Sequence, residues 1–261
     1  MSFSPITGQA DTTIHTRTDG LTHGMVQIPT FDGEIDAYHA VQQGKQGAPV
    51  VLVVQEIFGL HEHIQDVCRR LAHAGYFAIA VEHYQRQGDA NAYPDVPTLV
   101  SELVAKVPDE QVLADLDAAA KWAGQQGGDA SRLGVTGFCW GGRITWLYAA
   151  HNPACKAGVA WYGKLVSGHG AIQKYQPIDI AGKLHAPVLG LYGAQDASIP
   201  LDGIEKMQAA LAQGSEASKA SKFTVYPQAN HAFYADYRPN YRADDASDGW
   251  QQLLGWFTQY L

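Results

Sequence analysis

The fold is decided by residues 132–143, which read RLGVTGFCWGGR. The first five of these residues have a strand-like pattern, and the residues from Gly141 to Ala150 have a helical one. Between them, Gly137 and Gly141 bracket Cys139 in a G-x-nucleophile-x-G turn, where a Cβ at either glycine would clash with the adjoining strand or helix. The sequence therefore predicts that Cys139 is a nucleophile at the end of a strand and at the N-terminus of a helix, where free amides favour a thiolate.

Strand-like and helix-like segments alternate on both sides of this turn. Apolar or β-branched runs predict strands at residues 49–55, 77–81, 157–162, 187–192 and 222–226. Helical patterns extend over residues 64–74, 98–106, 109–125, 201–213 and 244–261. Two more strands, 25–29 and 35–41, flank Asp32-Gly33 and predict a hairpin. This alternation predicts a doubly wound α/β fold with a mostly parallel sheet flanked by helices, in which functional residues lie at the carboxyl ends of strands.

The chain contains no repeat and no Pro, Gly or Ser linker, so we expect one domain at residues 25–261 after a polar leader at residues 1–24. The leader lacks the basic start and apolar centre of a secretory signal. No apolar run approaches the ~20 residues needed to cross a bilayer. These observations predict a cytoplasmic protein without a membrane partner.

The net charge excludes some classes of partner. The 261 residues include 18 Lys and Arg and 26 Asp and Glu, which gives a formal charge of −8. Basic residues scattered along an acidic chain disfavour nucleic acid and anionic membranes as partners. The expected partner is a small-molecule substrate, and the sequence leaves open whether the protein is a monomer or a dimer.

The cysteines and histidines do not form an evident metal site. Cys68, Cys139 and Cys155 are an odd number at wide spacings, which fits neither a disulfide framework nor a CxxC-type zinc site. We expect Cys68 and Cys155 to be small buried apolar residues. The cluster His61-Glu62-His63 lacks the HExxH spacing and a third ligand. The sequence therefore predicts no metal and no organic cofactor.

A cysteine nucleophile needs a base and a group that orients the base. Asp196 and His231 each follow a predicted strand, and the chain order nucleophile, acid, histidine is the order expected for this kind of fold. Asp196 would hold the imidazole tautomer, while His231 would pair with the thiolate and later activate water. Asp202 and Asp179 are weaker candidates for the acid.

The loop after the strand 49–55 is the expected second half of an oxyanion hole. Its backbone N–H at Ile57 and the N–H of Trp140, which follows the nucleophile, would bind the developing negative charge. Glu56 in this loop is unusual, because it places a carboxylate near that charge. Glu56 either has a specific role in catalysis or simply caps the helix that begins near His61.

Four motifs together resemble the dienelactone hydrolase (carboxymethylenebutenolidase) family of α/β-hydrolases. The resemblance covers residues 25–261, and its motifs are Gln55-Glu-Ile-Phe-Gly59, Gly137-Phe-Cys-Trp-Gly-Gly142, Gly193-Ala-Gln-Asp196 and Asn230-His-Ala-Phe233. It implies a triad of Cys139, Asp196 and His231. It also implies a resting state in which the thiol is bonded to Glu56, until substrate displaces the carboxylate and Cys139 turns to the histidine as a thiolate.

One feature of the family has no counterpart by position. Members that act on dienelactone hold its carboxylate with two arginines, but Ala235 stands four residues after His231 and residues 87–121 contain no arginine. Dienelactone is therefore in doubt as the substrate. Arginines that could replace them in space, and aromatic residues that could line the pocket beside Trp140, are Arg86, Arg143, Arg238, Tyr84, Phe233 and Tyr234.

The predicted activity is hydrolysis of a small ester or lactone through a cysteinyl thioester intermediate. Three alternatives remain: another acyl substrate, such as a thioester or small peptide, on the same triad; a redox-sensing role for Cys139; and a non-catalytic binding module of hydrolase fold.

Overall fold

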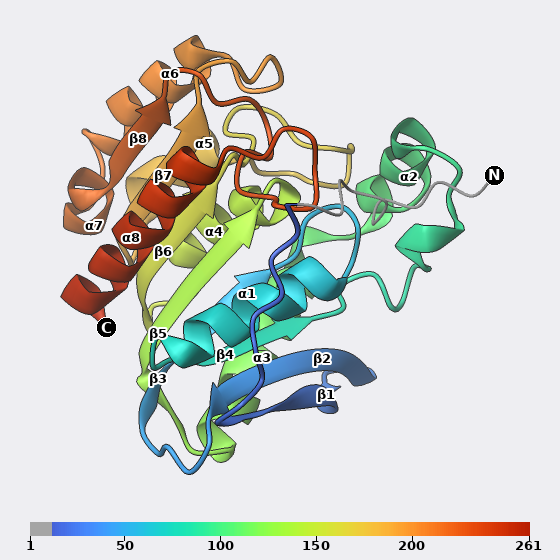
Figure 1. Ribbon diagram of the computed structural model, residues 1–261. Coiled ribbons are helices and arrows are strands. Elements are labelled where there is room, and N and C mark those ends of the chain that lie inside the picture. Colours follow the sequence, from blue (N-terminus) through green and yellow to red (C-terminus); the bar gives the residue numbers. More distant parts are fainter. Residues whose placement is uncertain (1–11) are drawn as a thin grey trace.

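The computed structural model describes residues 12–261, in which eight strands form one sheet (Figure 1). The strands are β1 (Leu21–Thr30), β2 (Gly33–Gln42), β3 (Ala48–Val54), β4 (Phe77–Val81), β5 (Gly128–Phe138), β6 (Cys155–Trp161), β7 (Val188–Gly193) and β8 (Lys222–Tyr226). Their order across the sheet is β1-β2-β4-β3-β5-β6-β7-β8. β2 pairs antiparallel with β1 and β4, and all other pairs are parallel. The predicted doubly wound, mostly parallel sheet is confirmed.

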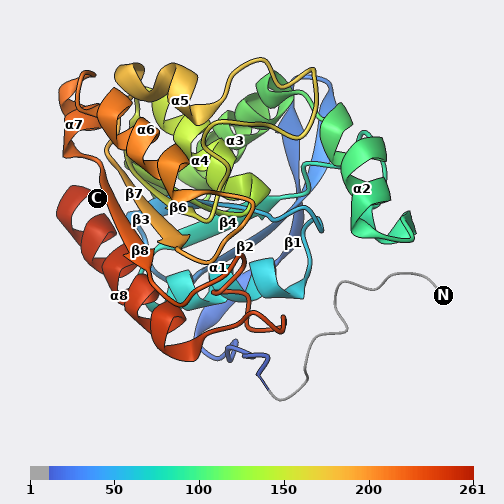
Figure 2. The same ribbon diagram turned by 90° about the horizontal axis from the view of Figure 1, so that it is seen from above.

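Helices cover both faces of this sheet. The α-helices are α1 (Glu62–His73), α2 (Val96–Glu102), α3 (Asp109–Gln125), α4 (Trp140–His151), α5 (Pro177–Ile180), α6 (Leu201–Leu211), α7 (Glu216–Ala220) and α8 (Ala243–Tyr260). Short 3₁₀ helices occupy Ala90–Ala92, Val104–Lys106 and Ala181–Lys183. Viewed from above, α1 and α8 lie on one face of the sheet, and α3, α4 and α6 lie on the other (Figure 2).

The central strands are apolar because both of their faces are covered. In β3, all residues except Pro49 are buried, which explains why this strand is a continuous apolar run rather than an alternating one. The register pairs Val54 of β3 with Gly137 of β5. The loop after β3 and the turn after β5 therefore begin side by side at the same edge of the sheet.

The N-terminal part differs from the predicted boundary. β1 begins at Leu21, four residues before the expected domain start, because the hairpin pairing extends from Thr30–Gly33 back to Leu21–Gln42. Residues 12–20 also contact the domain, since the backbone N–H of Thr16 donates a 2.6 Å hydrogen bond to Asp66. The rest of the predicted leader lies outside the described residues.

The helix predicted at residues 98–106 is wrong as a single element. The chain forms α2 and then a separate 3₁₀ turn at Val104–Lys106, because Leu103 leaves the helical conformation with φ −121° and ψ −67°. Leu99, Leu103 and Val104 are all buried, so the break turns successive apolar side chains into the core. The sequence pattern also missed α5 and α7, which are too short to show a helical period.

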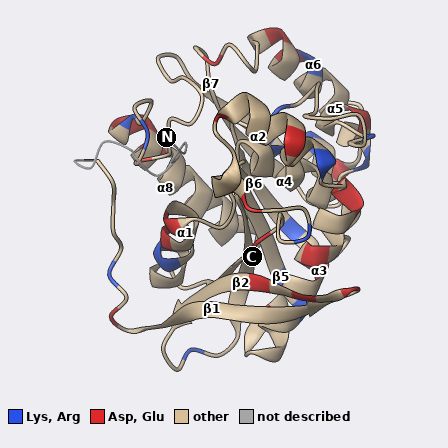
Figure 3. Ribbon diagram, turned by 90° about the vertical axis from the view of Figure 1, so that its right-hand side faces the viewer, with Lys and Arg blue, Asp and Glu red and all other residues tan. Residues whose placement is uncertain are grey.

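The distribution of charge and the length of apolar helices bear on the possible partners of the protein. Basic and acidic positions are interspersed on the face seen in Figure 3. Within residues 12–261, no helix is both long enough and apolar enough to span a bilayer.

Candidate active site

Cys139 lies in a tight turn between β5 and α4. Its backbone has φ 54°, and its N–H donates a 3.0 Å hydrogen bond to the carbonyl of Trp161 in β6. A Cβ at Gly137 would collide with the carbonyl of Gly141, and one at Gly141 would collide with the carbonyl of Val54. The predicted steric reason for both glycines is therefore confirmed.

Non-glycine residues with a positive φ gather at this edge of the sheet. Within the described residues, the non-glycine residues with positive φ are Cys139, Tyr162 and Ala232. Cys139 follows β5, Tyr162 follows β6, and Ala232 lies in the loop after β8, next to His231. Such conformations cost of order 1–3 kcal/mol each and are typical of functional sites.

The structure brings the three predicted triad residues together. The Sγ of Cys139 lies 3.1 Å from Nε2 of His231. On the other side of the imidazole, Nδ1 lies 2.6 Å from Oδ2 of Asp196. The other oxygen of Asp196 accepts hydrogen bonds from the N–H and hydroxyl of Ser198, at 2.9 and 2.6 Å. These contacts fix the carboxylate, which in turn orients the imidazole.

Electrostatics favour a protonated His231. Burial alone would lower its pKa, but the charge of Cys139 and the hydrogen bond to Asp196 outweigh burial and raise the pKa to about 10. Burial would likewise raise the pKa of Asp196, but hydrogen bonds from His231 and Ser198 lower it. The pair is therefore built to stabilise an imidazolium next to the sulfur.

The expected resting contact between Glu56 and the thiol is not found. The hydroxyl of Tyr237 donates a 2.5 Å hydrogen bond to Oε2 of Glu56, and Nε2 of His61 lies 3.4 Å from the same oxygen. Cys139 instead faces His231. The resemblance-based expectation is corrected in this respect, because Glu56 has its own buried partners.

These partners keep Glu56 ionised. Burial would raise its pKa, but the hydrogen bond and charge of His61, the charge of His63 and the hydroxyl of Tyr237 lower the pKa to about 2. Glu56 is nearly fully buried, and its Oε1 has no hydrogen-bond partner among the described residues. The capping alternative is not supported, since the helix cap at His61 shows no side-chain hydrogen bond.

The two predicted oxyanion donors flank the nucleophile. Ile57 lines the same pocket as Cys139, and no acceptor within residues 12–261 takes its backbone N–H. Trp140 is the first residue of α4, so its N–H has no partner within the helix.

The triad opens into a cavity of about 270 Å³. One wall is apolar, with Phe58 from the loop after β3 and Val96 and Val100 from α2. The rest of the lining comes from Ile57, Cys139, Tyr162, Lys164, His169, Ser198, His231 and Arg238. A pocket of this size admits a small substrate with one apolar and one charged side.

Of the arginines predicted to bind substrate, Arg238 lines this cavity, where its guanidinium lies 5.4 Å from the ring centroid of Phe58. Arg86 does not line it, because ion pairs to Asp32 and Asp115 hold its guanidinium elsewhere. Arg143 is fully buried and forms two 2.7 Å hydrogen bonds to Asp109.

Arg143 has a different role from the predicted one. Its guanidinium also donates to the carbonyl of Tyr175 and to Gln176. These contacts connect α4 and α3 to the segment that carries Lys164 and His169. Arg143 supports the wall of the cavity without facing it.

The predicted aromatic lining is also corrected. Tyr84 is buried against Trp140, with ring centroids 5.5 Å apart. Phe233 packs on Trp161 and Tyr162 behind the triad. Tyr234 stacks on Phe138 and accepts a hydrogen bond from Arg70. None of the three lines the cavity, because each is held in the core by neighbouring rings.

The sequence analysis missed Tyr162, Lys164, His169 and Ser198. Tyr162 and Lys164 come directly after β6, so the rule that strand ends carry function could have identified them. His169 has no comparable signal, since it lies in an irregular segment. Burial, together with the charge of Lys164, lowers its pKa to about 3, so it is neutral at physiological pH.

Each of the two histidines after the loop that carries Glu56 lies near a buried carboxylate. His63 Nδ1 lies 3.3 Å from Oδ1 of Asp236, and His61 faces Glu56. Within the part of the chain that the structure describes, no group of three or more His, Cys, Asp or Glu side chains is arranged to hold a metal ion.

Fold and site together define an α/β-hydrolase. The family model described as "Dienelactone hydrolase family" matches residues 35–261, and the chain belongs to this family. The protein is thus a carboxylic-ester hydrolase that acts on a small-molecule substrate.

Similar proteins come from several bacteria. A protein of Salmonella typhimurium (strain LT2) named "Putative carboxymethylenebutenolidase" is 58% identical over 252 residues, which is 96% of this chain and 92% of that protein. A protein of the same name from Escherichia coli (strain K12) is 57% identical with the same coverage. The crystal structure of a "Putative Dienelactone Hydrolase" from Klebsiella pneumoniae superposes with a TM-score of 0.89 at 58% identity, covering 93% of this chain and all of that one.

Proposed function

We propose that the protein hydrolyses a small ester or lactone with Cys139 as the nucleophile, His231 as the acid and base, and Asp196 as the group that orients His231. The observation that carries this proposal is the continuous contact from Cys139 Sγ through the imidazole to the buried carboxylate, at 3.1 and 2.6 Å. Such a chain of contacts is the geometric signature of an activated nucleophile.

In the acylation step, the sulfur of Cys139 bonds to the substrate carbonyl carbon. The carbonyl π electrons move to the oxygen, which accepts hydrogen bonds from the N–H groups of Ile57 and Trp140. When the carbonyl re-forms, the ester oxygen leaves and takes the proton of His231. The product is a thioester on Cys139 and the alcohol half of the substrate, which stays in the same molecule when the substrate is a lactone.

Acylation also prepares the next step. Part of the raised pKa of His231 comes from the negative sulfur of Cys139, and this charge disappears when the thioester forms. The neutral imidazole then accepts a proton from water, whose oxygen attacks the thioester carbonyl and expels the thiolate. The same histidine is therefore an acid before acylation and a base after it.

The cavity favours a substrate with a negative charge. Lys164 and Arg238 both line it, and neither has an ion-pair partner within residues 12–261. We therefore propose a lactone or ester that bears a carboxylate, in agreement with the name carboxymethylenebutenolidase that the relatives carry. Lys164 and Arg238 would take the place of the two arginines with which family members hold the carboxylate of dienelactone. This chain has no arginine at the corresponding positions.

The decisive experiment compares Cys139→Ala and Cys139→Ser with the wild-type protein on an activated aryl ester. We expect turnover to fall by about 10³-fold or more in the alanine variant. Cys155→Ala is the control, because burial raises the pKa of Cys155 to about 12 and this thiol cannot act at neutral pH. Wild-type turnover in either Cys139 variant would disprove the assignment of the nucleophile.

A further inference from the structure

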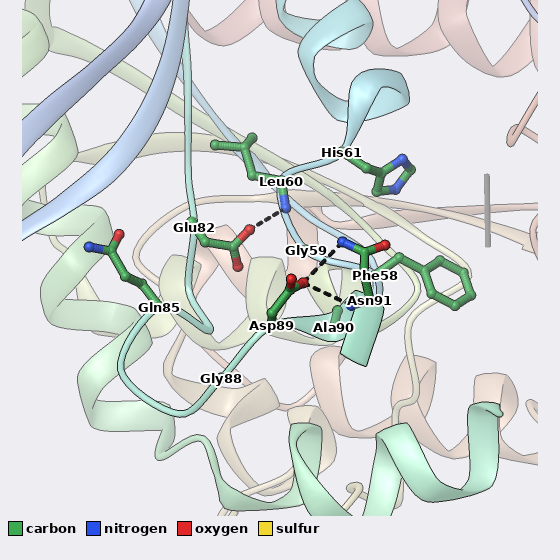
Figure 4. Close-up of a pocket in the computed structure, with 10 residues that line it drawn as sticks. All are labelled: Phe58, Gly59, Leu60, His61, Glu82, Gln85, Gly88, Asp89, Ala90 and Asn91. Carbon is green, nitrogen blue, oxygen red and sulfur yellow. Dashed lines mark hydrogen bonds between the residues drawn. The ribbon is translucent and has the colours of Figure 1, made fainter. Parts of the chain in front are cut away.

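The loop at residues 55–60 separates two cavities. On one side lies the 270 Å³ cavity that contains the triad, and on the other lies a cavity of about 440 Å³ between this loop and residues 82–91 (Figure 4). Phe58 lines both. Residues 55–59 are nevertheless buried. A buried backbone or side-chain donor that loses its acceptor is costly, so the position of this loop depends strongly on its hydrogen bonds.

The carboxylate of Glu82 accepts hydrogen bonds from both ends of this loop. Glu82 directly follows β4, and its Oε2 accepts a 2.6 Å hydrogen bond from the backbone N–H of Leu60, which is drawn in Figure 4. Its Oε1 accepts hydrogen bonds from the N–H of Tyr84 at 3.0 Å and from the side chain of Gln55 at 3.5 Å. Gln55 begins the loop and Leu60 ends it, so one carboxylate fixes both ends.

The loop is also pressed closely against this carboxylate. Gly59 has φ 78°, and a Cβ at this position would lie 2.8 Å from Oε2 of Glu82. The backbone N–H of Glu82 is itself bonded to the carbonyl of Asp36 at 2.8 Å, which ties the start of the side chain to β2. Glu82 thus links the loop to β2 and to the end of β4.

We propose that Glu82 is a positioning residue for hydrolysis, which holds loop 55–60 so that the N–H of Ile57 points at the developing oxyanion. This inference rests on the proposed function, because it takes Ile57 as an oxyanion donor. Glu82 touches neither substrate nor triad and acts through the loop. Since negative charge develops on the oxygen only in the transition state, a displaced loop lowers kcat more than it weakens substrate binding.

The test uses Glu82→Gln, which keeps the shape but leaves one acceptor oxygen for three donors. Its matched control is Asp89→Asn, which removes a carboxylate from the same cavity; Asp89 accepts hydrogen bonds from Asn91 and none from the loop. Three quantities are measured: kcat and KM on an aryl ester, and the rate of alkylation of Cys139 by iodoacetamide. Alkylation is a displacement that needs the thiolate but no oxyanion hole.

We expect Glu82→Gln to lower kcat by about 10- to 100-fold while KM and the alkylation rate change by no more than about threefold. Asp89→Asn should leave all three quantities unchanged. Unchanged kcat in Glu82→Gln overturns the inference, and so does an alkylation rate that falls in parallel with kcat. If this variant does not fold, Glu82→Asp, which withdraws the carboxylate by one methylene, is held to the same criteria. Failure of the proposed function is a separate result, since it appears as ester turnover in Cys139→Ala.

Discussion

The hydroxyl of Tyr237 donates a 2.5 Å hydrogen bond to Glu56 across 181 positions of sequence. Glu56 therefore belongs to a buried group with Tyr237 and His61, while Cys139 belongs to a second group with His231 and Asp196. The two groups lie at the same edge of the sheet but do not share a hydrogen bond. This separation allows a carboxylate to remain ionised near a nucleophile that also needs a negative charge.

Replacing Tyr237 with phenylalanine tests the hold on Glu56. The variant leaves a buried carboxylate without the hydroxyl that donates to it, so we expect the free energy of unfolding to fall by about 1–3 kcal/mol. Urea denaturation at pH 7 measures this change. Tyr241→Phe, at a less buried position, should change the unfolding free energy by no more than about 0.5 kcal/mol. Equal stability of Tyr237→Phe and wild type would show that Glu56 does not depend on this bond.

The titration of His231 provides a test of the proposed ion pair. Burial would lower its pKa, but Cys139 and Asp196 raise it to about 10, so His231 should stay protonated at neutral pH. We expect alkylation of Cys139, or Cys139→Ala, to lower the NMR titration midpoint of His231 by about one pH unit or more. An unchanged midpoint would contradict a charged sulfur beside the imidazole.

The raised pKa of His231 also makes the stability of the folded protein depend on pH. The folded-state pKa of His231 lies above its unfolded value of about 6.5. Proton binding at His231 therefore stabilises the folded protein fully below about pH 6.5, and this contribution is lost as the pH rises through about 10. The contribution should be smaller in Cys139→Ala, as measured by denaturation of both proteins across this range.

Lys164 should distinguish anionic from neutral substrates. We expect Lys164→Met to raise KM by about three- to tenfold for an ester that bears a carboxylate, because one partly exposed cation in the cavity is lost. KM for a matched neutral ester should not change. Lys174→Met is the control, because this exposed lysine lies on the same segment and pairs with Glu110 outside the cavity. A parallel rise in KM for both esters would argue against recognition of a carboxylate.

Much of the fold could be predicted, because it depends on local patterns. The strand at residues 222–226 has the predicted bounds, and the predicted order of strands and helices holds along the chain. The contact among Cys139, His231 and Asp196 could also be predicted, because each residue follows a strand and the register of a parallel sheet brings such positions to one edge. The predicted contacts of side chains were less accurate. Arg86 and Arg143 are cations near the site in sequence, but the choice of Asp115 and Asp109 as their partners depends on packing between distant segments.

Gly141 and Gly255 both lie in helices, but the space around them differs. Gly141 lies in the first turn of α4, where a Cβ would collide with the carbonyls of Val54 and Gln55. Gly255 lies in α8, where a Cβ would have no neighbour within 4 Å.

We expect Gly141→Ala to lower the unfolding free energy by at least about 1–3 kcal/mol. It should also reduce turnover, because the backbone of α4 must move away from β3 and carries the N–H of Trp140 with it. Gly255→Ala should instead raise the unfolding free energy by about 0.5–1 kcal/mol, since alanine is the better helix former, and leave turnover unchanged. Thermal denaturation and ester hydrolysis of both variants measure these effects. Gly141→Ala with wild-type stability and turnover would mean that the close approach of α4 to β3 is not required.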